Sequence, residues 1–133
     1  MFPCGKELRV AKERRVLDWR RNGAALVGTF RVAHLNDFHQ TDALRAQLAA
    51  TLAERDIRGV VLDCSGLVYL ISEVFGILIQ NHKDQRTAGR RQVLCGVEPE
   101  IMELLKANRL DAYLELRSDA KTAVAEMAEG KNV

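Results

Sequence analysis

Cysteine, histidine and aromatic residues are scarce in this chain. Its 133 residues include three cysteines and three histidines, and aromatic side chains make up 5% of the total. The cysteines, Cys4, Cys64 and Cys95, include no close pair and no Cys-x-x-Cys motif, and the histidines are scattered. Zinc sites and disulfide frameworks leave recognisable spacings of such residues. We therefore predict no metal site, and no cofactor.

Long apolar segments are also missing. The chain has no apolar run of about 18 residues, the length that a membrane-spanning helix requires. Its first residues, Met-Phe-Pro-Cys-Gly-Lys, lack the apolar core of a signal peptide. We expect a cytoplasmic protein without a membrane-inserted segment.

The motifs of common catalytic sites are absent as well. No Gly-x-Ser-x-Gly elbow surrounds Ser65 or Ser72, and neither of the glycine-rich phosphate-binding motifs occurs. A serine nucleophile also needs a base within hydrogen-bonding reach, and no histidine lies in a recognised pattern with one. We predict no catalytic residues and no enzymatic activity.

What the chain does contain suits one folded domain. A length of 133 residues with 47% hydrophobic side chains is typical of a single core. The first 22 residues hold seven basic side chains against three acidic ones. We interpret residues 1–14 as a basic arm, 15–128 as the domain and 129–133 as a frayed tail. The arm has no aromatic partner for stacking besides Trp19, so nucleic-acid binding is not expected.

Strand and helix patterns alternate along the domain, which predicts an α/β fold. Asn22-Gly23 favours a tight hairpin between the first two strands. Thr41 and Ser118 are the predicted caps of two helices, and Gly89 suits the position after a third. The predicted strands are 15–20, 24–32, 59–63, 92–97 and an edge strand at 113–117; the predicted helices are 41–55, 72–88, one from Pro99, and 119–128; residues 34–40 are a predicted polar loop.

The most informative segment runs from Val60 to Leu78. It is typical of a buried strand, a turn, and a helix with Ser72 in its first turn. Backbone N–H groups at a helix start lack partners, so they favour a hydroxyl or phosphate there. Ser72 is therefore either a helix cap or a displayed regulatory serine, and the two roles are compatible.

This segment resembles the core signature of STAS domains, the fold of sulfate transporters and anti-sigma factor antagonists. That signature is an apolar strand, Asp-x-Ser-Gly, and then Asp-Ser-Ser/Thr-Gly leading into a helix; Asp63, Ser65 and Gly66 match its first part. The resemblance extends from about Arg15 to Met127. It implies a mixed sheet of about five strands with about four helices packed mainly on one face.

The resemblance aligns Ser72 with the phosphorylatable serine of the antagonists, but its neighbours differ. Ile71 replaces the preceding acid, Glu73 the following hydroxyl residue, and Val74 the next glycine. Without the acid, an acceptor that could orient the hydroxyl during phosphoryl transfer is missing. Glu73 adds a carboxylate that the helix dipole favours and that repels a neighbouring phosphate. We therefore hypothesise a phosphorylation switch that is fixed or lost.

The resemblance also implies a partner-binding surface around the start of this helix. Its candidate residues are Asn36, Asp37, Ile71, Ser72, Glu73, Val74 and Phe75. Asn36 and Asp37 have an alternative role, because their side chains favour turns by bonding local backbone. Phe38 beside them belongs either to the core or to a contact patch.

The function that the resemblance implies is protein–protein regulation. The chain resembles an anti-sigma factor antagonist, which binds a serine-kinase anti-sigma factor and leaves the ATP to that partner. The alternative is a STAS subunit of a membrane transporter, or of a multi-protein signalling assembly, that acts as a scaffold. We expect a monomer or a weak homodimer.

Overall fold

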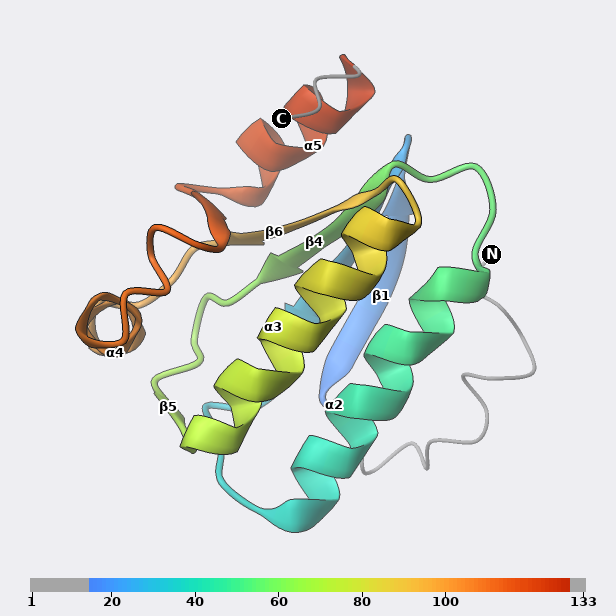
Figure 1. Cartoon of the computed structure of the whole chain (residues 1–133). Helices are drawn as coiled ribbons and strands as arrows, with labels where there is room; N and C mark the ends of the chain where they lie inside the picture. The colour runs from blue at the N-terminus through green and yellow to red at the C-terminus, as the bar shows by residue number, and fades with distance from the viewer. Residues whose placement is uncertain (1–14, 130–133) are drawn as a thin grey trace.

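The computed structural model describes residues 15–129, which form a five-stranded sheet with helices on both faces (Figure 1). The strand order is β1-β2-β4-β6-β7. The bounds are β1 Leu17–Asn22, β2 Ala25–Phe30, β4 Gly59–Asp63, β6 Arg91–Cys95 and β7 Glu115–Arg117. β1 is antiparallel to β2, and all other neighbours are parallel. The predicted mixed α/β sheet is confirmed, with β7 at one edge.

The hairpin between β1 and β2 turns where the sequence indicates. Asn22 pairs with Ala25, and Gly23 between them has a φ of +62°. Glycine adopts this left-handed conformation without the steric cost that a side chain brings.

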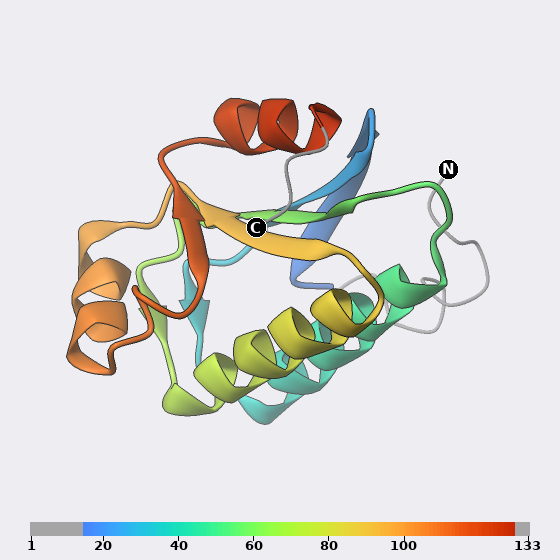
Figure 2. The ribbon, with the colours of Figure 1, turned by 45° about the horizontal axis from the view of Figure 1, so that its top comes forward.

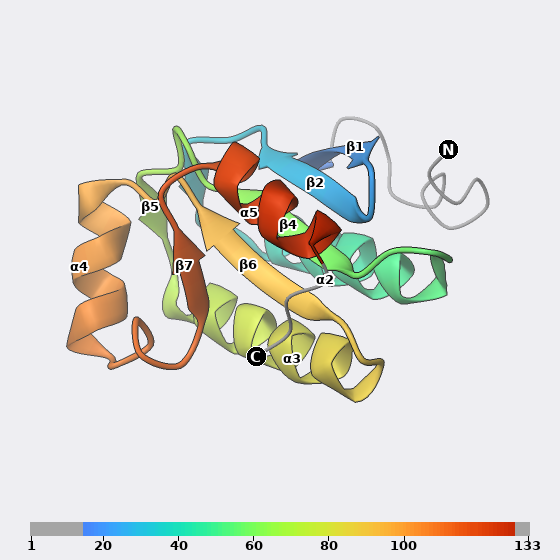
Figure 3. The ribbon, with the colours of Figure 1, turned by 90° about the horizontal axis from the view of Figure 1, so that it is seen from above.

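Over residues 15–129, four α-helices pack around the two sheets. They are α2 (Phe38–Ala50), α3 (Ser72–Thr87), α4 (Pro99–Ala107) and α5 (Ala120–Ala128), and a short 3-10 helix, η2 (Thr51–Ala53), follows α2. Figures 2 and 3 show α2 and α3 side by side beneath the sheet, with α5 on the opposite face. The predicted bias to one face is confirmed, because α2, α3 and α4 all pack into the larger core and only α5 into the smaller one.

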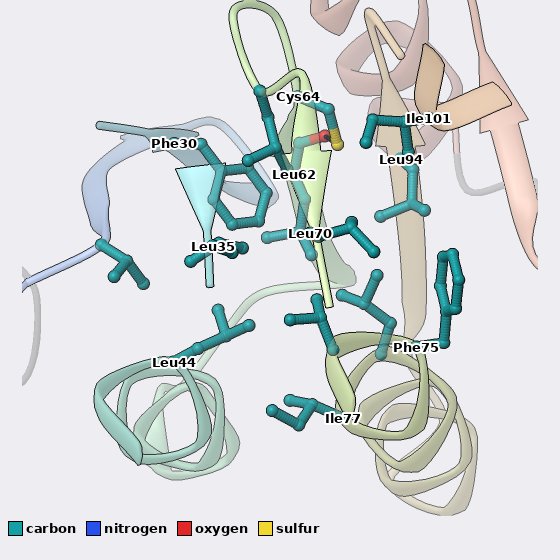
Figure 4. Close-up of a cluster of buried hydrophobic side chains, with 14 of the residues drawn as sticks. Phe30, Leu35, Leu44, Leu62, Cys64, Leu70, Phe75, Ile77, Leu94 and Ile101 are labelled. Carbon is teal, nitrogen blue, oxygen red and sulfur yellow. Dashed lines mark hydrogen bonds between the residues drawn. The ribbon is translucent and has the colours of Figure 1, made fainter. Parts of the chain in front are cut away.

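The two cores arise from alternation along the central strands. In β4, Val61 and the adjacent Leu62 are both fully buried, and they belong to clusters on opposite faces. Side chains of successive strand residues point to opposite faces, so an unbroken apolar strand is covered on both. Figure 4 shows Leu62 and Leu94 of the sheet facing Leu44, Phe75 and Ile77 of α2 and α3.

A second, two-stranded sheet lies at one end of the domain. β3 (His34–Leu35) pairs in parallel with β5 (Tyr69–Leu70), and the Ile71 N–H donates to the Leu35 carbonyl at 3.0 Å. The prediction of a polar loop over 34–40 is therefore wrong. Because β3 leads into α2 and β5 into α3, this pairing brings the starts of the two helices to the same end (Figure 1).

The start of α2 also differs from the prediction. Asp37 is the N-cap, and its Oδ1 accepts from the Gln40 N–H at 2.8 Å, while Gln40 Oε1 accepts from the Asp37 N–H at 3.2 Å. This reciprocal capping box starts the helix at Phe38 rather than at Thr41. α2 ends at Ala50, short of the predicted residue 55.

α5 is capped one residue later than predicted. Asp119, not Ser118, accepts from the Thr122 N–H at 2.8 Å. This hydrogen bond lowers the pKa of Asp119, because it favours the ionised carboxylate. The predicted arm over residues 1–14 and most of the predicted tail (130–133) lie outside the described residues.

Candidate functional site

Ser72 is the first residue of α3, and its side chain is exposed. The N-cap is Ile71, whose backbone is extended at φ −84°, and no side-chain hydrogen bond caps the helix. The capping role predicted for Ser72 is therefore wrong, because the cap position falls one residue earlier, on a side chain that cannot accept. The hydroxyl is displayed instead.

The turn before this helix is built by the residues that match the STAS signature. Ser65 donates to Asp63 Oδ1 from both its hydroxyl, at 2.7 Å, and its N–H, at 3.1 Å. Gly66, at φ +87°, donates its N–H to Glu98 Oε2 at 2.9 Å. These contacts hold the turn's shape and leave Ser72 as the exposed hydroxyl at the start of α3.

Glu73 forms an ion pair next to Ser72. Its carboxylate accepts from the Arg45 guanidinium of α2 at 2.7 Å, and Arg45 also lies 3.5 Å from Asp42. A guanidinium is the group best suited to bind a phosphate bidentately. Here it already binds a carboxylate. Sequence reasoning missed Arg45, because its contact with Glu73 spans 28 residues and joins two helices.

Two of the candidate partner-binding residues do not reach the surface. Val74 is fully buried and Phe75 is 8% exposed, both within the larger core (Figure 4 labels Phe75). They support the surface from beneath, and Val74, which stands where the family has a glycine, contributes to the core rather than to the surface. Ile71 is half-buried against the same core.

The remaining candidates lie at the same end of the molecule. Asn36 and Asp37 are exposed at the start of α2, and the N–H groups of both donate to Gln40. Their local bonding matches the turn chemistry expected of them. It also leaves them beside the start of α3, as the β3–β5 pairing requires.

Two exposed aromatic rings accompany these residues. Phe38 is 67% exposed at the start of α2, and Tyr69 of β5 is 47% exposed beside the His34 ring, 6.2 Å away between centroids. Phe38 thus lies on the surface and not in the core. Sequence reasoning missed Tyr69, because it reads as part of an apolar run. We call this end the Ser72 surface, formed by Asn36, Asp37, Phe38, Tyr69, Ser72 and Glu73.

A groove of about 590 Å³ runs between α2 and α3 from the Ser72 surface. Its lining residues are Arg45, Leu48, Ala49, Ser72, Glu73, Gly76, Ile77, Gln80, Asn81 and Asp84.

The family model of STAS domains matches residues 20–123 of the chain. The chain belongs to the STAS domain family. This assignment confirms the resemblance drawn from the segment between Val60 and Leu78.

This STAS domain is similar in sequence or fold to several known proteins, among them anti-sigma factor antagonists. It is 23% identical over 91 residues to an anti-sigma F factor antagonist of Paenibacillus polymyxa, covering 68% of this chain and 78% of that protein. A STAS domain protein of Planctomyces limnophilus has the same fold, with a TM-score of 0.75, 21% identity, and coverage of 84% and 97%. The murine Slc26a9 anion transporter matches with a TM-score of 0.68 and 14% identity, over 84% of this chain and 19% of the transporter.

The two cysteines in the described part of the chain, Cys64 and Cys95, are both buried thiols. Burial raises the pKa of the Cys95 thiol to about 12, and the Asp63 carboxylate adds to this effect. Burial likewise raises the pKa of Cys64. Thiols that stay protonated are poor nucleophiles, so both act as small apolar groups.

Neither a metal cluster nor a membrane-spanning helix occurs in the described part of the chain. Among residues 15–129, no three His, Cys, Asp or Glu side chains are grouped to hold a metal ion. Over the same residues, the helices are too short or too polar to cross a bilayer.

Proposed function

We propose that this STAS domain is a non-enzymatic interaction module that acts as an anti-sigma factor antagonist and binds a serine-kinase anti-sigma factor. The observation that carries the proposal is the exposed Ser72 at the first position of α3, beside exposed side chains of the α2 start. The Paenibacillus polymyxa relative supports it. The proposed role is cytoplasmic, since sigma factors act on RNA polymerase.

The proposed partner-binding residues are those of the Ser72 surface together with the half-buried Ile71. Phe38 and Tyr69 supply the large exposed apolar area that protein partners commonly cover. Asn36, Asp37 and Glu73 supply the polar groups around it. Val74 and Phe75 keep this surface in place from the core side.

We further propose that the phosphorylation switch is fixed. The Glu73 carboxylate already binds Arg45 at 2.7 Å, so this guanidinium of the groove is less available to a phosphate on Ser72. A phosphoserine carries about −1.5 to −2 charges at neutral pH, and Glu73 beside it would repel them. Ile71 offers no carboxylate to orient the Ser72 hydroxyl.

Affinity capture of the full chain from its native cells tests the proposal, with bound proteins and Ser72 phosphate read by mass spectrometry. We expect a kinase-like ATPase to be recovered and Ser72 to remain unmodified. Phe38→Ala should abolish its recovery. Leu104→Ala, a change at another exposed apolar residue, on α4, is the control and should not. Phosphate on a large share of Ser72 would contradict the fixed switch alone.

A second candidate function is a STAS subunit of a membrane transporter or of a signalling assembly. The fold similarity to the STAS-containing part of Slc26a9 favours it. Recovery of transporter or assembly subunits in the same capture experiment would replace the antagonist proposal. Gel filtration separates the two further, because we propose a monomer or weak homodimer, near 14.9 kDa or twice that mass, for the antagonist.

A further inference from the structure

The groove between α2 and α3 follows α3 from its first residue, Ser72, to Asp84. On α3 its lining residues recur every three to four positions, from Ser72 through Gly76 and Gln80 to Asp84. They form one helix face of about three turns, or roughly 18 Å at 1.5 Å per residue. This shape suits a helix laid along the groove, with anchor residues at i, i+3, i+4 and i+7, better than a compact ligand.

No contact among the described residues requires a glycine at position 76 of this groove. Gly76 lies inside α3, is exposed, and a Cβ built on it would meet nothing within 4 Å. Glycine is the least favourable helix residue after proline. Gly59 is the contrasting case, since a Cβ there would lie 2.2 Å from the Arg91 carbonyl oxygen. A glycine that nothing inside the molecule requires leaves room for a neighbour outside it.

The groove has apolar and charged lining residues. Leu48, Ala49 and Ile77 are apolar, and two of the three charged lining residues, Glu73 and Asp84, are carboxylates. The third, Arg45, pairs with Glu73, so these two charges offset each other and Asp84 leaves the lining with a net negative charge. The complementary occupant is basic along its edges and apolar along its centre.

We propose that the groove receives a basic amphipathic helix of the protein partner, whose backbone passes close to Gly76. The proposal rests on the proposed function in one respect, which is that the occupant belongs to a protein partner. It adds a second contact to the Ser72 surface, and Ser72 and Glu73 are common to both.

The test uses the full chain labelled with ¹⁵N and an amidated 18-residue probe peptide that has a leucine stripe flanked by lysines. A second peptide, with every lysine replaced by glutamate, is the charge control. We expect saturable shifts of amide signals along residues 45–49 and 72–84, and binding of the glutamate peptide at least about tenfold weaker.

Gly76→Leu fills the open space and should weaken lysine-peptide binding at least about tenfold, with an unchanged or higher Tm. Lys83→Ala is the control on the same helix, because Lys83 is exposed and does not line the groove. Asp84→Asn should weaken binding several-fold. If Gly76→Leu is less stable than the parent, Gly76→Ala replaces it.

Three results obtained with the peptide would overturn the proposal. They are the absence of saturable binding below about 1 mM, shifts centred elsewhere on the chain, and unchanged affinity in the stably folded Gly76 variants. Concentration-dependent shifts of the same amides without peptide would show that a second copy of the chain binds in the groove. That result would also overturn the proposal. None of these results bears on the capture of a kinase through the Ser72 surface, so the two proposals fail separately.

Discussion

At the scale of single residues, the space around a glycine decides what an added methyl group does. At Gly59 in β4, a Cβ would lie 2.2 Å from the Arg91 carbonyl oxygen, which is backbone and cannot yield cheaply. We expect Gly59→Ala to lower the free energy of unfolding by about 1–3 kcal/mol, since overpacking forces a backbone shift. Gly76→Ala should raise it by about 0.5–1 kcal/mol through helix propensity. Urea unfolding measures both.

The two changes are chemically identical, so each is the control for the other. Equal effects on stability would contradict this account, because they would mean that the backbone at β4 relaxes freely around a methyl group.

The sequence could predict which residues surround Ser72 but not where their side chains point. Ser72 and Glu73 are exposed as expected, whereas Val74 is fully buried. Helix phase decides this, and it depends on which residue begins the helix. Ile71 is the N-cap, so Ser72 is the first residue of the helix and not its cap. The Arg45–Glu73 pair could not be predicted at all, since it requires the packing of α2 on α3.

At the scale of elements, α5 is tied to the sheet by charges as well as by apolar packing. Arg91 of β6 is 6% exposed and pairs with Glu115 of β7 and, at 3.4 Å, with Glu126 of α5. Arg117 of β7 donates to Glu126 from Nε at 2.9 Å. One network therefore joins β6, β7 and α5. The network also pairs Glu115 and Arg117, the charged side chains of the edge strand β7.

This network makes stability depend on pH. The hydrogen bond from Arg117, followed by its charge and that of Arg91, lowers the pKa of Glu126. A lowered carboxyl pKa adds stability above the ordinary range of glutamate, about pH 4.3, and that stability is lost as pH falls through the lowered value. Glu126→Gln should cost about 0.5–1 kcal/mol at pH 7, because the pair is partly exposed, and less at low pH.

Urea unfolding between pH 3 and pH 7 measures the effect. Glu103→Gln, on an exposed position of α4, is the control and should follow the parent protein at each pH. A Glu126→Gln protein whose stability falls as steeply as the parent's between pH 7 and pH 3 would show that other groups cause the pH dependence.

Long periodic elements could be predicted from the sequence, whereas short ones could not. Gly59–Asp63 was predicted with its observed bounds, and α3 within one residue, because an apolar run and a helical period mark them. β3 and β5 have two residues each and carry no measurable period. They form only because the chain brings Leu35 and Leu70 together. Asp119 caps α5 in place of the predicted Ser118, because its carboxylate accepts a hydrogen bond from the Thr122 N–H.

At the scale of the whole molecule, the proposed binding end and the structural centre are different regions. β2, β4 and β6 lie between two cores, and their residues are almost all buried. The Ser72 surface lies instead beyond the sheet, on the β3–β5 pair and the starts of α2 and α3. Of the three departures from the family's signature around Ser72, only Glu73 is exposed, whereas Ile71 and Val74 pack with the larger core.

The separation of the proposed binding end from the structural centre predicts two levels of local stability. Backbone amides between two cores exchange with solvent only when much of the domain unfolds, whereas a ladder of two residue pairs opens locally. We expect the amides of β4 to exchange at least about a hundredfold more slowly than those of Tyr69, Leu70 and Ile71, as measured by hydrogen exchange with NMR detection. Amides of β5 that exchange as slowly as those of β4 would contradict the prediction. The Ser72 surface would then be as rigid as the sheet, and a partner would have to fit it without any adjustment. A ladder that opens locally instead lets the start of α3 adjust when a partner binds.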